Sequence, residues 1–413
     1  MRRHPELLIP ASSLEVLKTA VIFGADAVYI GGEAFGLRAK AKNFSMEEMR
    51  EGIEFAHEHD VKVYVTANIL AHNSDLPEVR KYFEELKGLK PDALIIADPG
   101  VFDIAKEVCP EIERHISTQA NNTNYGTYNF WYRQGASRVV SARELSMKEL
   151  KELRANIPED LEIETFIHGA MCISYSGRCL LSNYFTGRDA NRGACTHPCR
   201  WKYAVVEETR PGEYMPVYEN ERGTYIFNSK DLCMIEHIPE LIDAGIDSLK
   251  IEGRMKTALY VATVARTYRK AIDDYQKDPE LYRQNIPWYL DQISNCTYRK
   301  FTTGFFFGKP DDDAQIYDSN TYVKDYTYLG IVGGTEDGLC RIEQRNKFSV
   351  GETIEIMKPD GRNVEVTVER IVNEDGEEQE SAPHSKQVLY VKLSECPEKF
   401  DILRRAENSG DIA

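Results

Sequence analysis

The sequence predicts an α/β protein, with a (β/α)8-barrel-like domain followed by a small antiparallel β-barrel. Through the first 255 residues, strand-like apolar runs alternate with amphipathic helical segments, and this alternation is typical of a parallel sheet. From about residue 327 the pattern changes to short alternating strands with turn signals, which are typical of a small β-barrel. We therefore expect one domain over residues 1–325 and a second over residues 326–413.

Eight strand-like runs support the larger barrel, each with six or seven residues. They are residues 6–11, 26–32, 62–68, 93–99, 114–119, 138–143, 163–169 and 248–254. Eight βα units favour a (β/α)8 barrel, and an open doubly wound sheet is the alternative. In both folds the carboxyl ends of the strands line the site.

Helix boundaries are marked at both ends. A serine followed three residues later by a glutamate fits the capping box, in which side chains satisfy the free amides of the first helical turn. These pairs are Ser12 with Glu15, Ser45 with Glu48, and Ser146 with Glu149. Glycines that end helices are expected two or three residues before the next strand, at Gly24, Gly135 and Gly245.

Polar side chains follow most of the predicted strands. They are Asn68, Asp98, Gln119, Arg143, His168, Glu252 and Arg254. A single polar residue at a strand end usually only meets water, but seven that converge on one rim indicate a functional site. The regular spacing breaks over residues 170–247, an insertion expected to lie over the barrel mouth and to contain a further strand at residues 224–229.

The charge is unevenly distributed along the chain. The net charge of −16 ordinarily disfavours a nucleic-acid partner, because phosphates are bound by lysine and arginine. Basic residues nevertheless gather in segments 172–203 and 250–270. These segments are compatible with a localised polyanion site, and a solvated face is the alternative.

The sequence predicts a cytoplasmic protein that does not contact a membrane. No apolar run approaches the ~20 residues of a membrane helix, and the N-terminus lacks the apolar region of a signal peptide. Thiols stay reduced in the cytoplasm, so the nine cysteines are not expected to form disulfides. Cysteines that stand singly are expected to be small buried residues or inert thiols, namely Cys109, Cys296, Cys340 and Cys396.

Four other cysteines, Cys172, Cys179, Cys195 and Cys199, follow the spacing C-x6-C-x15-C-x3-C. Thiolates are soft ligands that suit zinc or an iron–sulfur cluster. Structural zinc sites generally use two closely spaced pairs, so this spacing favours a [4Fe–4S] cluster. Zinc and the absence of any metal remain alternatives.

A peptidase is also an alternative. His168 precedes Cys172 by four residues, and a Cys–His pair can form an activated nucleophile. The sequence offers no local signature for a third, orienting group and no HExxH motif of a zinc peptidase.

Several segments resemble the collagenase-like peptidase family of unassigned catalytic type. Residues 164–182, ETFIHGAMCISYSGRCLLS, are similar to the signature of that family. Other segments look more specifically like its branch of prephenate-dependent tRNA uridine hydroxylation proteins. These segments are residues 183–201, 228–232, 249–256, 302–308 and 347–357.

This resemblance implies hydroxylation of the wobble uridine of tRNA to 5-hydroxyuridine, with prephenate as co-substrate and a [4Fe–4S] cluster. It implies that the cluster ligands are Cys172, Cys179, Cys195 and Cys199, and Cys233 is not expected to be a ligand. The implied partners are the tRNA anticodon loop, prephenate and a second homologous subunit. Relatives hydroxylate ribosomal RNA or ubiquinone precursors, and the family name suggests a peptidase, so these activities are alternatives.

The remaining site residues are assigned by their chemistry. Arginines bind a dicarboxylate such as prephenate by bidentate pairing, and Glu252 and His168 are candidates for proton transfer. The arginines expected to bind prephenate are Arg143, Arg178 and Arg254. The residues expected to bind tRNA phosphates are Arg188, Arg192, Arg200, Lys202 and Lys256, with Tyr184 and Trp201 as stacking partners for a base.

Overall fold

The computed structural model describes most of the chain. The described residues are 4–32, 43–172, 174–176, 178–192, 194–201, 204–206, 214–216, 230–296, 300–308 and 326–407. Lys202 and the strand expected at residues 224–229 lie outside them. Contacts divide the chain into two units, one of residues 1–21, 26–256 and 299–321 and the other of residues 22–25, 257–298 and 322–413.

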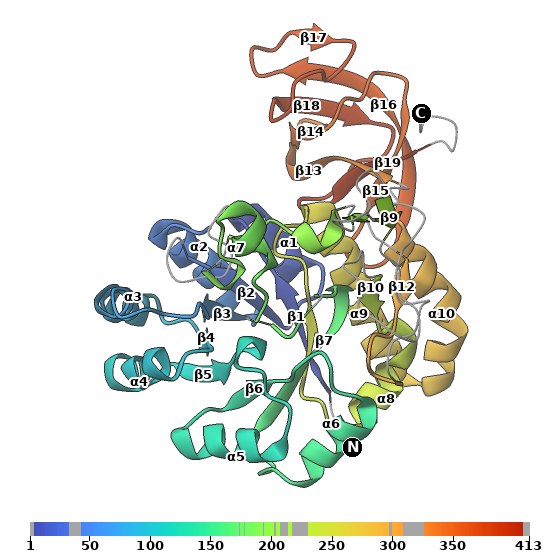
Figure 1. The fold of residues 1–413 in the computed structure, drawn as a ribbon. Coiled ribbons are helices and arrows are strands. Elements are labelled where there is room, and N and C mark those ends of the chain that lie inside the picture. Colours follow the sequence, from blue (N-terminus) through green and yellow to red (C-terminus); the bar gives the residue numbers. More distant parts are fainter. Residues whose placement is uncertain are drawn as a thin grey trace. The chain divides into compact units, whose positions relative to one another are not determined.

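Eight parallel strands of the first unit form a closed barrel (Figure 1). The strands are β1 (Glu6–Pro10), β2 (Ala27–Gly31), β3 (Lys62–Ala67), β4 (Ala93–Ile96), β5 (Glu113–Ile116), β6 (Arg138–Val140), β7 (Glu162–Ala170) and β11 (Ser248–Ile251). Strand β11 pairs with both β1 and β7. This closure confirms the predicted barrel and excludes the open sheet.

Helices alternate with the barrel strands in the chain. They are α1 (Leu14–Ile22), α2 (Met46–His57), α3 (Leu76–Leu89), α4 (Pro99–Val108), α5 (Tyr125–Gln134), α6 (Met147–Ala155) and α8 (Ile238–Asp243). The capping boxes at Ser45 and Ser146 are confirmed. The one predicted at Ser12 is wrong: α1 begins one residue later than expected, and the amide of Val16 donates to Ser13 Oγ instead (3.4 Å).

Acidic residues at the amino ends of the strands satisfy backbone amides. Asp26, Asp92 and Asp247 each directly precede a strand. Their carboxylates accept hydrogen bonds from backbone amides of the neighbouring strands, those of Leu7, Val63 and Ile163, at 2.7–2.8 Å.

The predicted helix-ending glycines adopt the expected left-handed backbone, with φ of 104° at Gly24, 96° at Gly135 and 75° at Gly245.

A charged network fills the amino-terminal half of the barrel interior, where apolar side chains usually dominate. Arg138 contacts Glu6 (2.6 Å), Glu162 (2.7 Å by Nε) and Glu164 (3.2 Å). Lys250 contacts Glu164 at 2.5 Å. Burial acts to raise the pKa of Glu6, but the charge and hydrogen bond of Arg138, together with hydrogen bonds from Tyr64 and Ser248, hold the pKa at about 2.

The insertion between β7 and β11 contains short elements. They are α7 (Leu181–Thr186), β8 (Ala204–Val206), β9 (Tyr214–Pro216) and β10 (Asp231–Cys233). Strand β10 pairs antiparallel with β7, so that Cys233 lies opposite His168, and it pairs on its other side with β12 (Phe301–Thr302). Two of the four predicted cluster ligands, Cys172 and Cys179, lie in the segment that connects β7 to α7.

The second unit contains helices α9 (Ala258–Lys277) and α10 (Pro279–Ser294) and a small β-barrel. Its strands are β13 (Tyr326–Glu336), β14 (Leu339–Gln344), β15 (Thr353–Met357), β16 (Asn363–Asn373), β17 (Glu378–Gln379), β18 (Val388–Leu393) and β19 (Ile402–Ala406). Six of these strands form a closed barrel, because β15 pairs with β16, and the short strand β17 pairs antiparallel with β16. The predicted antiparallel barrel is thus confirmed.

Buried Arg266 of α9 connects the parts of this second unit. It donates to Gln292 of α10 (2.5 Å), to Asn363 of β16 (2.8 Å) and to the carbonyl of Lys358 (2.8 Å).

The expected domain boundary between residues 325 and 326 adjoins a segment outside the described residues and stays a prediction. In the described part of the chain, no helix is long and apolar enough to cross a membrane.

Candidate functional site at the carboxyl ends of the barrel strands

Arg143 lies shortly after the carboxyl end of β6, and its guanidinium has a buried donor without an acceptor among the described residues. Its guanidinium stacks 3.8 Å from the ring centroid of Phe166, and Nη1 donates to the carbonyl of Ala170 (2.7 Å). Its Nη2 lies 3.4 Å from Glu252 Oε2. The buried Nε has no acceptor in the described part of the chain. Such a guanidinium is held in a fixed orientation and retains capacity to bind an anion.

Arg254 follows β11 and is buried. Its Nη1 donates to Thr66 Oγ1 (3.1 Å) and its Nη2 to Asn43 Oδ1 (3.4 Å). A Cβ at Gly31 would lie 2.0 Å from Arg254 Nη2. Only glycine at position 31 therefore leaves room for this guanidinium against β2.

His168 is buried on β7, and its carbonyl accepts the amide of Glu252 (2.8 Å). Burial, assisted by the charge of Lys256, lowers the pKa of His168 to about 3. This histidine is therefore neutral at physiological pH and is a weak base that accepts a proton poorly. Glu252, which also lies beside Arg143, is the more suitable candidate for proton transfer.

The cysteines of the insertion lie near these groups. Cys172 and Cys195 have exposed surface, whereas Cys179 and Cys199 are half-buried. Desolvation of its sulfur raises the pKa of Cys172 although the residue keeps exposed surface; Arg143 opposes this shift, while Cys195, Glu252 and Cys179 add to it. Cys172 is therefore within electrostatic reach of Arg143 and of two other predicted ligands, Cys179 and Cys195.

The donor set fits an iron–sulfur cluster, because such clusters are usually held by four cysteine thiolates. Within the described residues, no group of three or more His, Cys, Asp or Glu side chains is close enough to hold a metal ion. The cluster therefore stays a prediction.

A clamp connects the cysteine segment, residues 171–201, to the loop between β3 and α3. Arg192 forms a bidentate ion pair with Asp75, at 2.9 and 3.0 Å, and this hydrogen bonding lowers the pKa of Asp75. The carbonyl of Asn191 accepts the amide of Leu70 (3.3 Å), and Asn191 Nδ2 donates to the carbonyl of Cys179 (3.3 Å). Arg192, predicted to bind phosphate, thus has both terminal nitrogens on a carboxylate.

Breaking this clamp should loosen the cysteine segment without unfolding the protein. The pair is partly exposed, with 35% of Arg192 and 15% of Asp75 accessible, so we expect a loss of only about 0.5–1 kcal/mol. Asp75→Asn should therefore speed proteolysis within residues 171–201 roughly threefold. This holds when the segment recloses faster than it is cleaved, so that the cleavage rate follows the population of the open form. The double variant Asp75→Arg/Arg192→Asp should restore the slower rate, and unchanged cleavage in Asp75→Asn would contradict the clamp.

The other predicted RNA contacts differ in accessibility. Arg188 is exposed and Lys256 is half-buried, and Arg178, which was predicted to bind prephenate, is exposed. Arg200 lies in a short 3-10 helix, Pro198–Arg200, and only its backbone is described. Among the aromatic residues, Tyr184 is 82% exposed, Trp201 46% and Phe185 43%, and the ring of Phe185 lies 5.1 Å from that of Tyr184 and 6.2 Å from that of Trp201.

Sequence reasoning missed two polar features and misjudged one rim residue. Asp98 caps α4 by accepting the amides of Gly100 and Val101 and has this structural role. Glu144, next to Arg143, has a pKa that burial raises. Ser117, directly after β5, accepts the side-chain amide of Asn68 and the backbone amide of Gln119, which the sequence STQANN did not indicate.

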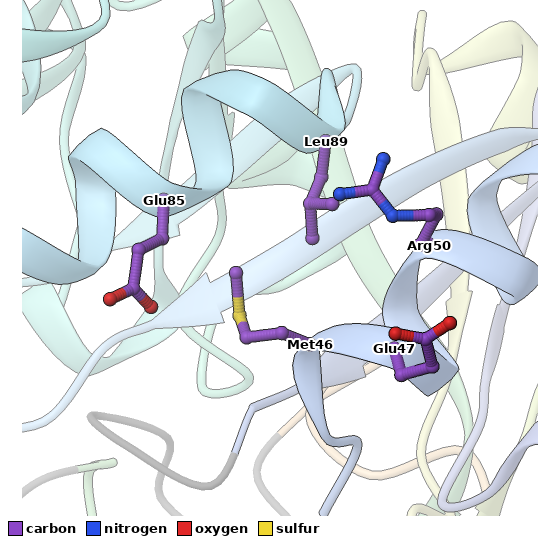
Figure 2. Close-up of a pocket in the computed structure, with 5 residues that line it drawn as sticks. All are labelled: Met46, Glu47, Arg50, Glu85 and Leu89. Carbon is purple, nitrogen blue, oxygen red and sulfur yellow. The ribbon is translucent and has the colours of Figure 1, made fainter.

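A separate surface pocket lies on α2 and α3 (Figure 2). It is lined by Met46, Glu47, Arg50, Glu85 and Leu89. None of these is a predicted site residue, and the pocket is open with mixed charges. We assign no function to it.

The chain belongs to peptidase family U32. Residues 12–316 match this family, and residues 324–404 match the family's C-terminal domain. The sequence is 42% identical to tRNA hydroxylation protein P1 of Bacillus subtilis, over 98% of this chain and 96% of that protein. It is 39% identical to tRNA hydroxylation protein P of Escherichia coli, over 94% of each chain. The family resemblance is thus confirmed.

A further relative is described as a protease. The chain is 43% identical to an uncharacterized protease of Methanocaldococcus jannaschii, over 73% of each chain. Both the hydroxylation and the peptidase descriptions therefore occur among similar proteins.

Proposed function

We propose that this protein is a tRNA modification enzyme that hydroxylates the wobble uridine of tRNA to 5-hydroxyuridine, with prephenate as co-substrate. The observation that carries the proposal is the similarity to tRNA hydroxylation proteins over nearly the full length of both chains. Both the barrel and the C-terminal domain are covered by these matches.

Charge supports the cysteine segment as the RNA-facing part. Residues 171–201 contain four arginines and one aspartate, and of these arginines Arg192 is paired with Asp75. Residues 326–407 contain eleven basic and seventeen acidic residues. Phosphates bind basic surfaces, so the small β-barrel is a poor candidate for RNA contact. The exposed rings of Tyr184, Phe185 and Trp201 offer stacking surfaces for unpaired bases.

Cys172, Cys179, Cys195 and Cys199 would hold the [4Fe–4S] cluster, which would supply electron transfer when bound. Arg143 and Arg254 would orient the two carboxylates of prephenate, because each guanidinium is immobilised by its own contacts. Conversion of C5–H to C5–OH is a two-electron oxidation that also requires an oxygen donor. Within it, we assign to Glu252, and not to buried His168, the acceptance of the proton that leaves C5.

Nucleoside mass spectrometry of a gene deletion tests this function. We expect 5-hydroxyuridine and its derivatives to disappear from bulk tRNA and to return when the wild-type gene is restored. Unchanged tRNA with altered ribosomal RNA or quinones would reject the tRNA substrate in favour of those alternatives. Cleavage of gelatin or collagen that survives loss of the four cysteines would instead favour a peptidase.

A further inference from the structure

Several buried amide oxygens at the barrel mouth have no hydrogen-bond donor. In the described part of the chain, Asn68 Oδ1, Gln119 Oε1 and Asn121 Oδ1 are buried and without a partner. An unsatisfied buried acceptor costs roughly 1–3 kcal/mol, and native proteins contain few of them. Gln119 and Asn121 belong to one turn, and Asn68 is hydrogen-bonded to Ser117 at the start of that turn. Three unpartnered acceptors on residues linked in this way indicate a site that a ligand completes.

Ser117 links Asn68 to the turn that carries Gln119 and Asn121. Its Oγ accepts Asn68 Nδ2 (3.1 Å) and the backbone amide of Gln119 (3.2 Å), and it is itself buried. Asn68 follows β3 and Ser117 follows β5, so the group joins the carboxyl ends of two barrel strands. We call Asn68, Gln119 and Asn121 the amide cluster.

The orientation of the cluster is fixed in part by the backbone. Asn121 Nδ2 donates to the carbonyl of Gln119 (2.9 Å), and Asn121 adopts a left-handed backbone with φ of 54°. Rotating this amide would place its oxygen against a carbonyl oxygen and lose the bond. Asn121 Oδ1 is therefore the acceptor that has no partner in the described part of the chain.

The amide cluster belongs to the same end of the barrel as the candidate site. Thr66 of β3, two residues before Asn68, accepts a hydrogen bond from Arg254. Leu70, two residues after Asn68, donates to the carbonyl of Asn191 in the cysteine segment. The same short stretch of β3 and its loop thus connects the arginine, the amides and the cysteines.

Acceptor oxygens select a ligand that carries donors. Prephenate carboxylates are themselves acceptors and are better matched to Arg143 and Arg254. A uridine offers donors in its N3–H and ribose hydroxyls. We propose that the amide cluster binds the target nucleoside and that its oxygens accept the uracil N3–H, while the arginines bind the carboxylates. This assignment rests on the proposed function.

Methylation of N3 tests the assignment, because it removes the donor from the base. Anticodon stem-loop RNA with uridine or 3-methyluridine at the wobble position would be titrated by fluorescence anisotropy. We expect wild-type protein to bind the methylated RNA roughly tenfold more weakly, the effect of one lost hydrogen bond. Gln119→Ala and Asn68→Ala should each weaken binding of the uridine RNA and reduce this discrimination.

Stability and prephenate binding provide independent readouts. Because Gln119 Oε1 is unpartnered, Gln119→Ala should keep or raise the thermal midpoint, whereas loss of a structural amide would lower it. Prephenate affinity by calorimetry should be unchanged. Asn129→Ala is the matched control, since this amide of α5 donates to the carbonyl of Asn156 (2.9 Å) away from Ser117.

The outcomes separate this inference from the proposed function. If wild-type protein hydroxylates uridine RNA but binds the methylated RNA equally well, the amide assignment is overturned and the proposed function stands. Weaker prephenate binding by Gln119→Ala, with RNA discrimination intact, would also overturn it. If no uridine RNA is bound or hydroxylated, the proposed function fails and the amide assignment fails with it.

Discussion

Cys179→Ser is expected to give a protein that purifies without colour and retains little of the cluster iron, against about four irons per chain in the wild type. Serine is a harder and much less acidic ligand than cysteine, so it holds a soft iron–sulfur cluster poorly. The fold should persist, because the contact at this position, from Asn191 Nδ2, uses the backbone carbonyl of Cys179. Iron and sulfide assays on anaerobically purified protein measure the effect.

The matched control for Cys179→Ser is Cys396→Ser. Cys396 is exposed and belongs to the second unit, so its replacement should leave the iron content unchanged. Wild-type protein that contains one zinc and no iron would reject the cluster, as would full iron retention by Cys179→Ser. Because these assays count metal and not turnover, they do not depend on identifying the substrate.

The barrel could be predicted because its signals are local. Each apolar run and each serine–glutamate capping pair spans only a few residues, so these signals can be recognised without knowledge of the fold. Barrel closure is not local: it depends on β11 pairing with β1, whose paired residues Glu6 and Ser248 are 242 positions apart in the sequence. The open sheet could be excluded only from the structure.

Site residues were predicted by their location at strand ends, but their partners were not. Arg143 and Glu252 were both expected on the rim, and the structure brings them together at 3.4 Å. Arg192 was assigned to RNA because a basic segment contains it, yet its partner Asp75 lies 117 positions away. A basic segment alone does not show which of its arginines can bind phosphate, because an acidic residue far away in the sequence can already pair with one of them.

Single cysteines show the same limit. Cys109, Cys296 and Cys340 are buried as expected, whereas Cys396 is exposed. The strongly lowered pKa of His168 likewise depends on its burial beside Phe301, a segment more than 130 residues further along the chain. Burial is a property of the assembled fold, so sequence position alone did not distinguish a buried histidine from a catalytic one.

Arg138→Ala is expected to lower the free energy of unfolding of the barrel unit by about 3–5 kcal/mol, the range for removing one partner of a buried ion pair. Glu164 would keep Lys250 as a partner, but Glu6 would remain in the barrel interior without its cation. Urea denaturation at neutral pH measures the loss. Arg80→Ala is the control: Arg80 makes a similar ion pair with Glu107, but both side chains are exposed, and its removal should have little effect.

The acid dependence of stability distinguishes this charge effect from simple loss of packing. In the wild type the pKa of Glu6 is held at about 2 against an ordinary 4.5. Its stabilisation, about 3 kcal/mol, is therefore fully present above pH 4.5 and fades as the pH falls toward 2. In Arg138→Ala, burial without a cation should raise the pKa of Glu6, so mild acid should lessen the deficit relative to wild type. A deficit that stays constant between about pH 7 and pH 4 would show that lost packing, and not an uncompensated carboxylate, destabilises the variant.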